Sequence, residues 1–383
     1  MFDSLFSGYA NNHFISSFIN KGLLPNPDKL LTRLGSNFEA YRDLKTDAHI
    51  WSCIQSRKSG SLALEHYIEN NTNNEELSKF IEMVLTRLDF DSLQNNILEA
   101  IFFGFQVIEI IWDYQYIGDS VYLLPQKLIS KQQELFAFGE AGELLIKTIG
   151  NELEKAPIYK YLLAINESNN GNPYGEAILS KCYWYALFKN GTSRFWINYA
   201  EKYGSPMLLA QFQRGASQDE AEKLADALAG MSQDSVIVSP SDYKIDIAES
   251  NRSASVELFK ELIKFCNSEI SKAILSETLT TEMEGGSFAA AEVHYKIRKE
   301  LIKRDSQMIR KVINTLIQYI IEVNNLGNEF PRFIHIINDA DNISRIDRDI
   351  KLFNAGIKLS KEYWKRTYGL KNEDFDEQIL SKE

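Results

Sequence analysis

The sequence contains few of the residues that build disulfide frameworks or metal centres. Among 383 residues there are three cysteines and five histidines. Cys53, Cys182 and Cys266 form no CxxC pair, so a disulfide framework is excluded and a reducing compartment is expected. The three thiols are expected to be small core side chains.

Positive charge is also scarce. There are 42 Lys and Arg residues against 53 Asp and Glu residues, which gives a formal net charge of -11. Wrapping nucleic acid in a basic surface requires cations that replace phosphate counterions, so the composition argues against this mode of binding. It does not exclude DNA that moves past the protein without adhering. With 44% hydrophobic and 25% charged residues, two or three globular domains are expected.

Long apolar runs are missing. The most apolar stretch, residues 101–112, is too short for a membrane span and contains Glu109. The first residues carry no basic segment and place Asp3 before any apolar run, so no secretory signal is expected. These features predict a soluble cytoplasmic protein without a membrane partner.

Motifs for catalysis are absent as well. The chain has no GxxxxGK[ST], GxSxG or HExxH pattern. One acidic stretch, ILSETLTTEMEGGSFAAAEVH at 274–294, leaves a metal-dependent hydrolase or nuclease open, because hard cations bind clustered carboxylates. Its candidate ligands are Glu277, Glu282, Glu284, Glu292 and His294. Glu292 and His294 are two residues apart on a predicted helix and so point to different faces, which favours a loop with Ser287 capping the next helix.

Periodicity predicts an α+β, mainly helical fold. Helices are expected from Asp43, over 71–90 and from Ser92 through Ile108, and a small sheet in the β-branched and aromatic runs that follow. A helix over 176–203 is aromatic around nearly its whole girth, which suggests neighbours on several sides, as in a ring of subunits. An α/β unit at 205–250 separates it from a second long helix, 253–276, and a third begins near residue 288.

Several stretches together resemble the portal proteins of Mu-like tailed bacteriophages and prophages. They include DAHIWSCIQSRKSG (47–60), EAIFFGFQVIEIIW (99–112), ISKAILSETLTTE and GSFAAAEVH. The most specific runs from 172 to 207, with a Tyr-Gly turn, a Phe-Lys-Asn helix and a Trp helix that ends in Tyr-Gly-x-Pro. Its matching residues are Tyr174, Gly175, Phe188, Lys189, Asn190, Trp196, Tyr203, Gly204 and Pro206. The resemblance covers residues 25–370, is only approximate over 113–165 and does not extend to 371–383.

The resemblance implies a phage portal fold with wing, stem, clip and crown regions, in which long stem helices bracket a small clip. The expected divisions are an N-terminal arm and wing (1–172), a first stem helix (173–204), the clip (205–250), a second stem helix (251–276), a tunnel loop (277–287), a long helix returning to the wing (288–340) and crown-like helices (341–383).

The resemblance also implies a function without catalysis, cofactor or metal. Subunits would form a homo-oligomeric ring, usually of twelve, at a capsid vertex, through which double-stranded DNA is packaged and ejected. The expected partners are terminase, a head-tail adaptor, and capsid and scaffold proteins; the location is the virion, and the host cytoplasm during assembly. Another head-completion or connector ring is the alternative among structural proteins.

Three groups of residues are assigned to this function. The DNA-channel loop comprises Glu277, Thr280, Thr281, Glu282, Glu284, Gly285 and Gly286. Stem packing is assigned to Tyr183, Trp184, Phe188, Phe195, Trp196, Tyr199 and Tyr203. Partner docking by the clip is assigned to Arg214, Asp219, Glu220 and Lys223. The basic pairs Arg57-Lys58, Arg298-Lys299 and Lys303-Arg304 are expected on exposed helix faces, where they form ion pairs within or between subunits, with contact to DNA as the less favoured alternative.

Overall fold

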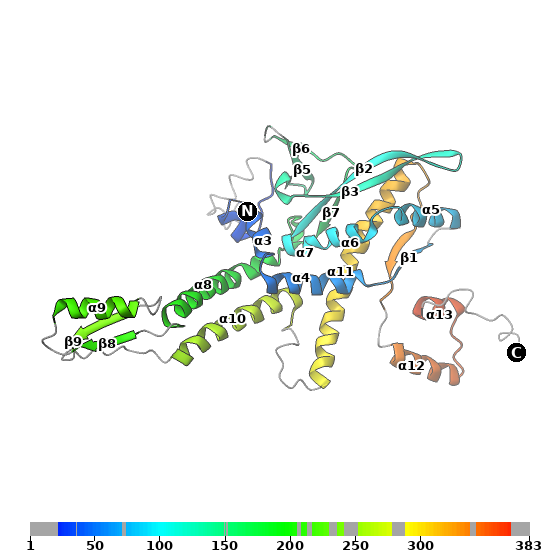
Figure 1. Ribbon diagram of the computed structural model, residues 1–383. Coiled ribbons are helices and arrows are strands. Elements are labelled where there is room, and N and C mark those ends of the chain that lie inside the picture. Colours follow the sequence, from blue (N-terminus) through cyan, green and yellow to red (C-terminus); the bar gives the residue numbers. More distant parts are fainter. Residues whose placement is uncertain are drawn as a thin grey trace, which may run out of the picture. The chain divides into compact units, whose positions relative to one another are not determined.

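The chain divides into two compact units, each made of segments distant in sequence. Unit 1 is Met1–Ser36, Gln55–Ala177 and Arg298–Glu383, and unit 2 is Asn37–Ile54 and Ile178–Ile297. The computed structural model describes residues 22–35, 37–70, 74–148, 150, 152–204, 208–212, 217–229, 236–240, 252–277, 288–337 and 342–368. Helices α4 (Ala48–Leu62) and α11 (Phe288–Val323) contribute to both units (Figure 1). None of the helices in these described ranges is long and apolar enough to span a membrane.

Unit 1 contains most of the strands. Its other elements are α2 (Lys29–Arg33), β1 (His66–Glu69), α5 (Glu75–Thr86), α6 (Phe90–Ile97), α7 (Glu99–Phe103), β2 (Phe105–Ile117), β3 (Ser120–Lys131), η3 (Gln133–Leu135), β4 (Phe136–Phe138), β5 (Leu144–Lys147), β6 (Leu153–Lys155), β7 (Tyr161–Ile165), η4 (Asn169–Gly171), β10 (Arg332–His335), α12 (Asn342–Asn354) and α13 (Lys361–Tyr368).

The main sheet of unit 1 is antiparallel, in the order β3-β2-β7. The central strand β2 is buried over most of its first half because both of its neighbours pair with it there, whereas residues 113–117 pair with β3 alone. Asn324 fastens the end of α11 to β3, since its side chain donates to the Leu123 carbonyl over 2.8 Å and accepts from the Leu123 amide over 2.7 Å.

The predicted helix from Ser92 to Ile108 is wrong in its second half. Helix α7 ends at Phe103, and β2 begins at Phe105. Gly104 lies between them at φ 92°, a conformation that favours glycine. The apolar residues after Gly104 were equally compatible with a helical stripe and with a buried strand, and pairing with β3 and β7 decided for the strand.

Two glycines link two family motifs that are far apart in sequence, 99–112 and 172–207. Gly104 and Gly175, at φ 92° and 64°, lie back to back in unit 1. A Cβ on Gly175 would lie 2.2 Å from the Gly104 carbonyl oxygen, and a Cβ on Gly104 would lie 2.4 Å from the Tyr174 carbonyl oxygen. The Tyr174 ring packs edge-on against Phe105 and Phe138. The Tyr-Gly turn therefore closes on the start of β2.

Buried ion pairs attach α4 within unit 1. Arg57 donates from Nε and Nη2 to both carboxylate oxygens of Asp305 on α11, at 2.8 and 3.0 Å, and both side chains are almost fully buried. Lys58 is also buried and pairs with Glu99 of α7. The prediction of an exposed Arg57-Lys58 pair is therefore wrong. Their acidic partners are distant in sequence, so the pattern around residue 57 could not reveal them.

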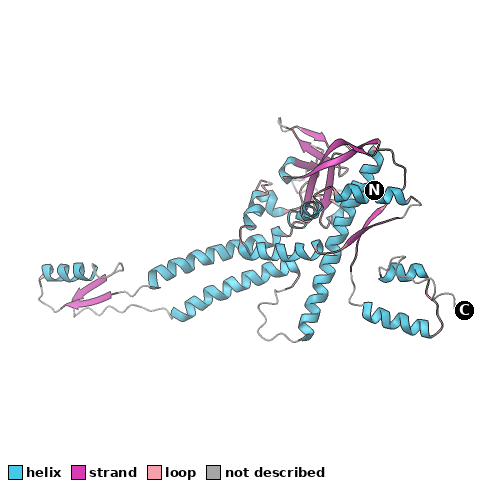
Figure 2. Ribbon diagram, turned by 45° about the vertical axis from the view of Figure 1, so that its right-hand side comes forward, coloured by secondary structure: helices cyan, strands magenta, loops and turns pink. Residues whose placement is uncertain are grey.

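Unit 2 contains the long paired helices. Its elements are α3 (Glu39–Leu44), α8 (Leu179–Gly204), β8 (Leu208–Phe212), α9 (Gln218–Ala229), β9 (Val236–Pro240) and α10 (Arg252–Leu275). Helices α8 and α10 lie side by side (Figures 1 and 2). Strands β8 and β9 are parallel, and α9 lies between them in sequence, as in a βαβ crossover.

Candidate subunit interface on the stem helices

The facing sides of α8 and α10, the helices predicted to form a stem, are closely packed. Small or medium side chains at helical spacing are buried, including Cys182 and Ala186 on α8 and Cys266, Ile270 and Ile274 on α10. The buried thiol of Cys182 has its pKa raised to about 12, chiefly by burial. Such a thiol acts as a small apolar side chain, not as a nucleophile.

Aromatic rings also pack between α8 and α10. Phe259 of α10 stacks on Trp196, with centroids 6.5 Å apart, and meets the edge of Tyr199 at 5.8 Å. Tyr185 contacts Phe265 edge-on at 6.1 Å. Trp196 and Tyr199, two of the residues assigned to stem packing, therefore pack within their own subunit.

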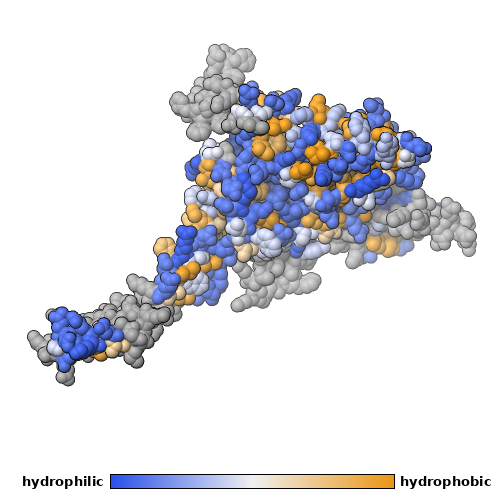
Figure 3. Space-filling view, turned by 45° about the horizontal axis from the view of Figure 1, so that its top comes forward, coloured by the Kyte–Doolittle hydropathy of each residue, from blue (hydrophilic) through white to orange (hydrophobic). Residues whose placement is uncertain are grey.

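A second apolar surface on α8 is exposed. Trp184, Phe188 and Phe195 are 49%, 52% and 69% exposed, and their spacing of four and seven residues places them on one face. Tyr183 and Trp184 are in edge-on contact. Figure 3 shows apolar side chains at the surface of the described part of these helices. The side chain of Tyr203 lies outside the described residues.

Helix α10 carries a matching exposed stripe. Leu258, Leu262 and Phe265 follow each other at spacings of four and three residues and are 67%, 40% and 54% exposed. Contiguous exposed apolar surface on a soluble protein marks a site of association. Each of these two helices thus has a covered inner face and an outer stripe of exposed apolar side chains, and Phe265 lies at the border because it also contacts Tyr185.

A polar cluster anchors the base of the stem helices in unit 2. Asp47 caps α4 by accepting from the amides of His49 and Ile50, and its carboxylate oxygens lie 2.8 and 2.9 Å from Lys189 Nζ. Burial would raise the pKa of the Asp47 carboxyl, but the hydrogen bond from Lys189 and those from the backbone hold it below its ordinary value. His49 Nε2 lies 2.9 Å from the Asn267 carbonyl oxygen and 2.8 Å from Ser271 Oγ.

This cluster was not predicted, although its residues occur in the family motifs. Asp47 and His49 belong to DAHIWSCIQSRKSG, and Lys189 to the Phe-Lys-Asn segment. A sequence signal was present, since Asp two residues before a helical His is a capping pattern. The partner of the carboxylate lies 142 residues away, which local pattern does not reveal.

Most of the predicted channel loop lies outside the described residues. This applies to Thr280, Thr281, Glu282, Glu284, Gly285 and Gly286, while Glu277 is half-buried just after α10. The side chains of Glu292 and His294, the other candidate metal ligands, also lie outside them. Within the described part of the chain, no three His, Cys, Asp or Glu side chains are grouped as metal ligands would be.

The clip residues are partly described. Lys223 and Asp219 form an exposed pair one turn apart on α9, with Nζ and Oδ2 separated by 2.7 Å. Glu220 caps the same helix, because its carboxylate accepts from the Ser217 amide over 3.0 Å. Arg214 lies outside the described residues. The three described side chains stabilise their own helix and remain available at its surface.

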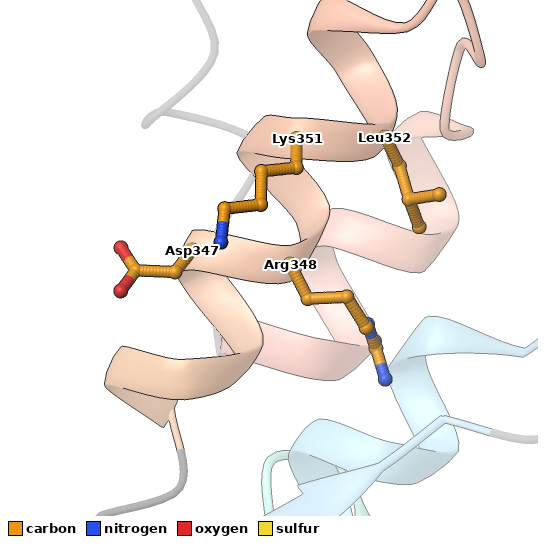
Figure 4. A pocket seen from close by; sticks show the side chains of 4 residues that line it. All are labelled: Asp347, Arg348, Lys351 and Leu352. Atoms are coloured by element: carbon orange, nitrogen blue, oxygen red, sulfur yellow. The ribbon is translucent and has the colours of Figure 1, made fainter.

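A shallow pocket occurs on α12 of unit 1. Its lining residues are Asp347, Arg348, Lys351 and Leu352. Figure 4 shows the Asp347 and Lys351 side chains next to each other, while Arg348 and Leu352 point away from them. Arg348 and two tyrosines of α13, Tyr363 and Tyr368, hydrogen-bond the buried Asp349 carboxylate. The cluster fastens α12 to α13 and has no nucleophile or metal-ligand arrangement.

Comparison with known proteins decides the family. A sequence profile described as "Portal protein of Mu bacteriophage" matches residues 38–370. The chain belongs to this family of phage portal proteins. The portal protein of Escherichia phage Mu is 24% identical over 327 residues, which cover 82% of this chain and 63% of the Mu protein. The Mu-like prophage FluMu protein gp29 of Haemophilus influenzae is 21% identical, with 83% and 63% covered. The chain therefore spans less than two thirds of the length of these relatives.

Solved structures share the fold of this chain. A chain of the native gene transfer agent virion superimposes with a TM-score of 0.54 at 12% identity, covering 86% of this chain and 93% of that chain. A chain from the neck of an empty gene transfer agent particle gives 0.55 at 12% identity, with 93% and 98% covered. The α+β, mainly helical portal fold is thus confirmed, as is the resemblance to Mu-like portal proteins. Membership of a portal family does not favour the hydrolase alternative.

Proposed function

We propose that the chain is the subunit of a homo-oligomeric portal ring at a capsid vertex, through which double-stranded DNA is packaged and ejected. The carrying observation is the outer apolar stripe on each stem helix of a chain that belongs to a portal family. Trp184, Phe188 and Phe195 of one subunit would pack on Leu258, Leu262 and Phe265 of the next. Such an arrangement is heterologous, and it gives a ring when the rotation from one subunit to the next closes on itself.

The remaining regions take roles that follow from this proposal. Residues 1–172 and 288–340 would form the arm and wing, 173–204 and 251–276 the stem, 205–250 the clip and 341–383 the crown. The clip would dock terminase or a head-tail adaptor through Arg214, Asp219, Glu220 and Lys223. Capsid and scaffold proteins would bind elsewhere on the ring, which would assemble in the host cytoplasm, usually with twelve copies. No catalytic residue or cofactor takes part.

The acidic segment after α10 would be the channel loop. Glu277, Glu282 and Glu284 would repel phosphates and keep the duplex from adhering, since like charges at close range raise the energy of contact. Deleting 284–286 is expected to leave ring assembly intact and to impair packaging or retention of DNA. Normal packaging by that variant would contradict the assignment of this loop.

The ring is tested by the mass of the purified full chain in solution, measured by mass photometry and imaged in negative stain. A Phe195→Glu, Leu258→Glu variant is expected to remain a folded monomer. Asn190→Glu, on a different exposed face of α8, serves as the matched control and should still assemble. Monomers of the unaltered chain under all conditions, together with metal-dependent DNA cleavage, would replace the portal proposal by the hydrolase alternative.

A further inference from the structure

The outer face of α11 in unit 1 carries a row of cations. Lys299, Lys303 and Arg310 lie close to one line along the helix, and Arg304 and Lys311 lie roughly a third of a turn around the helix from that line. Between Lys299 and Lys311 the row spans about 18 Å at the helical rise of about 1.5 Å per residue. Four of these five side chains are classed as exposed, and Lys299 is half-buried.

Three of these cations have no acidic partner within the described part of the chain. Arg304 pairs with Glu167 over 2.5 Å. By contrast, none of the ion pairs among the residues that the structure describes includes Lys303, Arg310 or Lys311. Lysines on the exposed side of α10 behave differently, because Lys260, Lys264 and Lys272 each pair with a glutamate three residues earlier. In a chain with a net charge of -11, a row of unpaired cations is a local reversal of sign.

The chemistry of the row fits a phosphate backbone better than a protein surface. Its exposed members are Lys and Arg together with Gln307 and a single carboxylate, Glu300, with no large apolar side chain among them, so the cations outnumber the acid. Protein interfaces are centred on aromatic and apolar anchors and are depleted in lysine, whereas contacts to nucleic acid backbones are made by Lys and Arg. Duplex DNA offers about one negative charge per 1.7 Å of axis, and Lys303 to Lys311 span about 12 Å along the helix, so these cations face several phosphates.

A groove next to the row raises a competing ligand, an acidic peptide. This groove of about 250 Å³ lies beside the row, and its lining includes Leu163 and Ile165 of β7 and Met308, Arg304 and Lys311 of α11. Its apolar floor and two cations suit an acidic peptide, whereas the carboxylates of Glu167 and Asp305 in the same lining, each paired with an arginine, disfavour one. The groove contacts only one edge of the row, because Lys303 and Arg310 are not part of its lining.

We propose that Lys303, Arg310 and Lys311 form a sequence-independent contact surface for the sugar-phosphate backbone of double-stranded DNA. This inference rests on the proposed portal function and deepens it. Three cations per subunit, repeated around a ring, attract the duplex while each single contact stays weak and salt-labile. A surface of this kind keeps the duplex aligned with the ring while the duplex still moves through it.

The test compares two triple variants of the full-length protein. Lys303→Gln, Arg310→Gln, Lys311→Gln removes the row, and Lys79→Gln, Lys127→Gln, Lys155→Gln removes the same charge from other exposed sites of unit 1. Binding of a short fluorescent duplex of arbitrary sequence is followed by anisotropy across a range of salt concentrations. The row variant is expected to bind about tenfold or more weakly at low salt, with the slope of log K against log salt reduced by about 3.

The control variant is expected to keep the affinity and slope of the unaltered protein. Equal affinities and slopes for all three proteins, or no binding by the unaltered protein, would overturn the inference. Unchanged DNA binding combined with loss of poly-glutamate binding would assign the surface to an acidic protein partner instead. Mass photometry of the same samples separates the two proposals: rings that bind DNA independently of the row contradict only this inference, whereas an absence of rings contradicts the portal function.

Discussion

Helix α11 and the stem pair α8 and α10 cover their apolar surfaces in opposite ways. In α11, a run of isoleucines from Ile309 to Ile321 is fully buried within unit 1, and the exposed side of its first half is charged. In the stem helices, apolar side chains occur on the inner and the outer faces. The contrast teaches that the apolar side of α11 is covered within unit 1, whereas α8 and α10 keep exposed apolar surface, which is what the proposed subunit interface requires.

This comparison can be tested by the free energy of unfolding of the subunit and by its assembly, measured separately. Substitutions around α11 should unfold the chain. Outer-stripe substitutions on the stem should leave the fold intact and abolish the ring. The expected effects on folding stability decrease from the first case below to the last.

The largest loss is expected from Asp305→Ala. This change leaves the buried Arg57 guanidinium without its carboxylate, and breaking a buried pair from one side costs about 3–5 kcal/mol. Urea unfolding followed by circular dichroism measures the loss. Asp219→Ala, which breaks an exposed helical pair, should change stability by about 0.5 kcal/mol or less. Similar losses in both variants would show that the Arg57 pair contributes no more than a surface contact.

Acidification should destabilise unit 1 through His335. Burial and the facing His66 lower the pKa of His335 from 6.5 to about 4, with Arg310 acting in the same direction and a hydrogen bond to the Ser306 backbone opposing them. The native state keeps this imidazole neutral while the unfolded chain binds a proton. Stability is therefore lost as the pH falls from about 6.5 to about 4, by about 3 kcal/mol at most.

His335→Gln removes this titration. The variant should show a shallower dependence of unfolding free energy on pH between 6.5 and 4 than the unaltered protein, whatever its stability at neutral pH. Unfolding curves at a series of pH values measure the difference. Identical slopes in the two proteins would contradict a neutral, buried His335.

Trp196→Ala should have an intermediate effect. Its ring is half-buried and stacks on Phe259 of the same subunit, so its loss is expected to cost about 1–2 kcal/mol, less than for a fully buried tryptophan. Thermal unfolding of the subunit under conditions that keep it monomeric measures this cost. If the variant and the unaltered subunit unfolded at the same temperature, the contact between Trp196 and Phe259 would not stabilise the fold.

The smallest effect on folding is expected from Phe195→Ser. Phe195 is the sequence neighbour of Trp196, but its side chain is 69% exposed. The substitution should therefore change the stability of the subunit by about 0.5 kcal/mol or less. Assembly, measured by mass photometry, should nevertheless fail because an outer anchor is lost. Intact rings in the Phe195→Ser protein would remove this residue from the proposed interface.

The two long helices α8 and α10 could be predicted from sequence, because a long helix follows from the pattern of neighbouring residues. Divisions at 173–204 and 251–276 are close to α8 (Leu179–Gly204) and α10 (Arg252–Leu275). The sequence also showed that aromatic residues surround the first of these helices. It did not show which of them face the partner helix and which face outward. Trp196 and Phe195 are adjacent aromatics, and only the position of Phe259 shows that one faces inward.

Long-range polar contacts escaped prediction for a related reason. Arg57 and Lys58 look like an ordinary basic pair on a helix surface, and each is buried because an acid from another helix reaches it. The separation of 248 residues between Arg57 and Asp305 leaves no local trace. In a chain with 53 acidic residues, sequence pattern equally could not show that Lys303, Arg310 and Lys311 form no ion pair within the part of the chain that the structure describes.

The sequence by itself determined the family, the mainly helical α+β character and the long helices, because motifs, periodicity and capping are properties of neighbouring residues. Tertiary structure alone decided where the helix before Gly104 ends and β2 begins, which charges are buried in pairs, and which aromatic faces of the stem remain open. Those outcomes depend on contacts between segments that lie far apart in the chain, whose geometry exists only once the fold has formed.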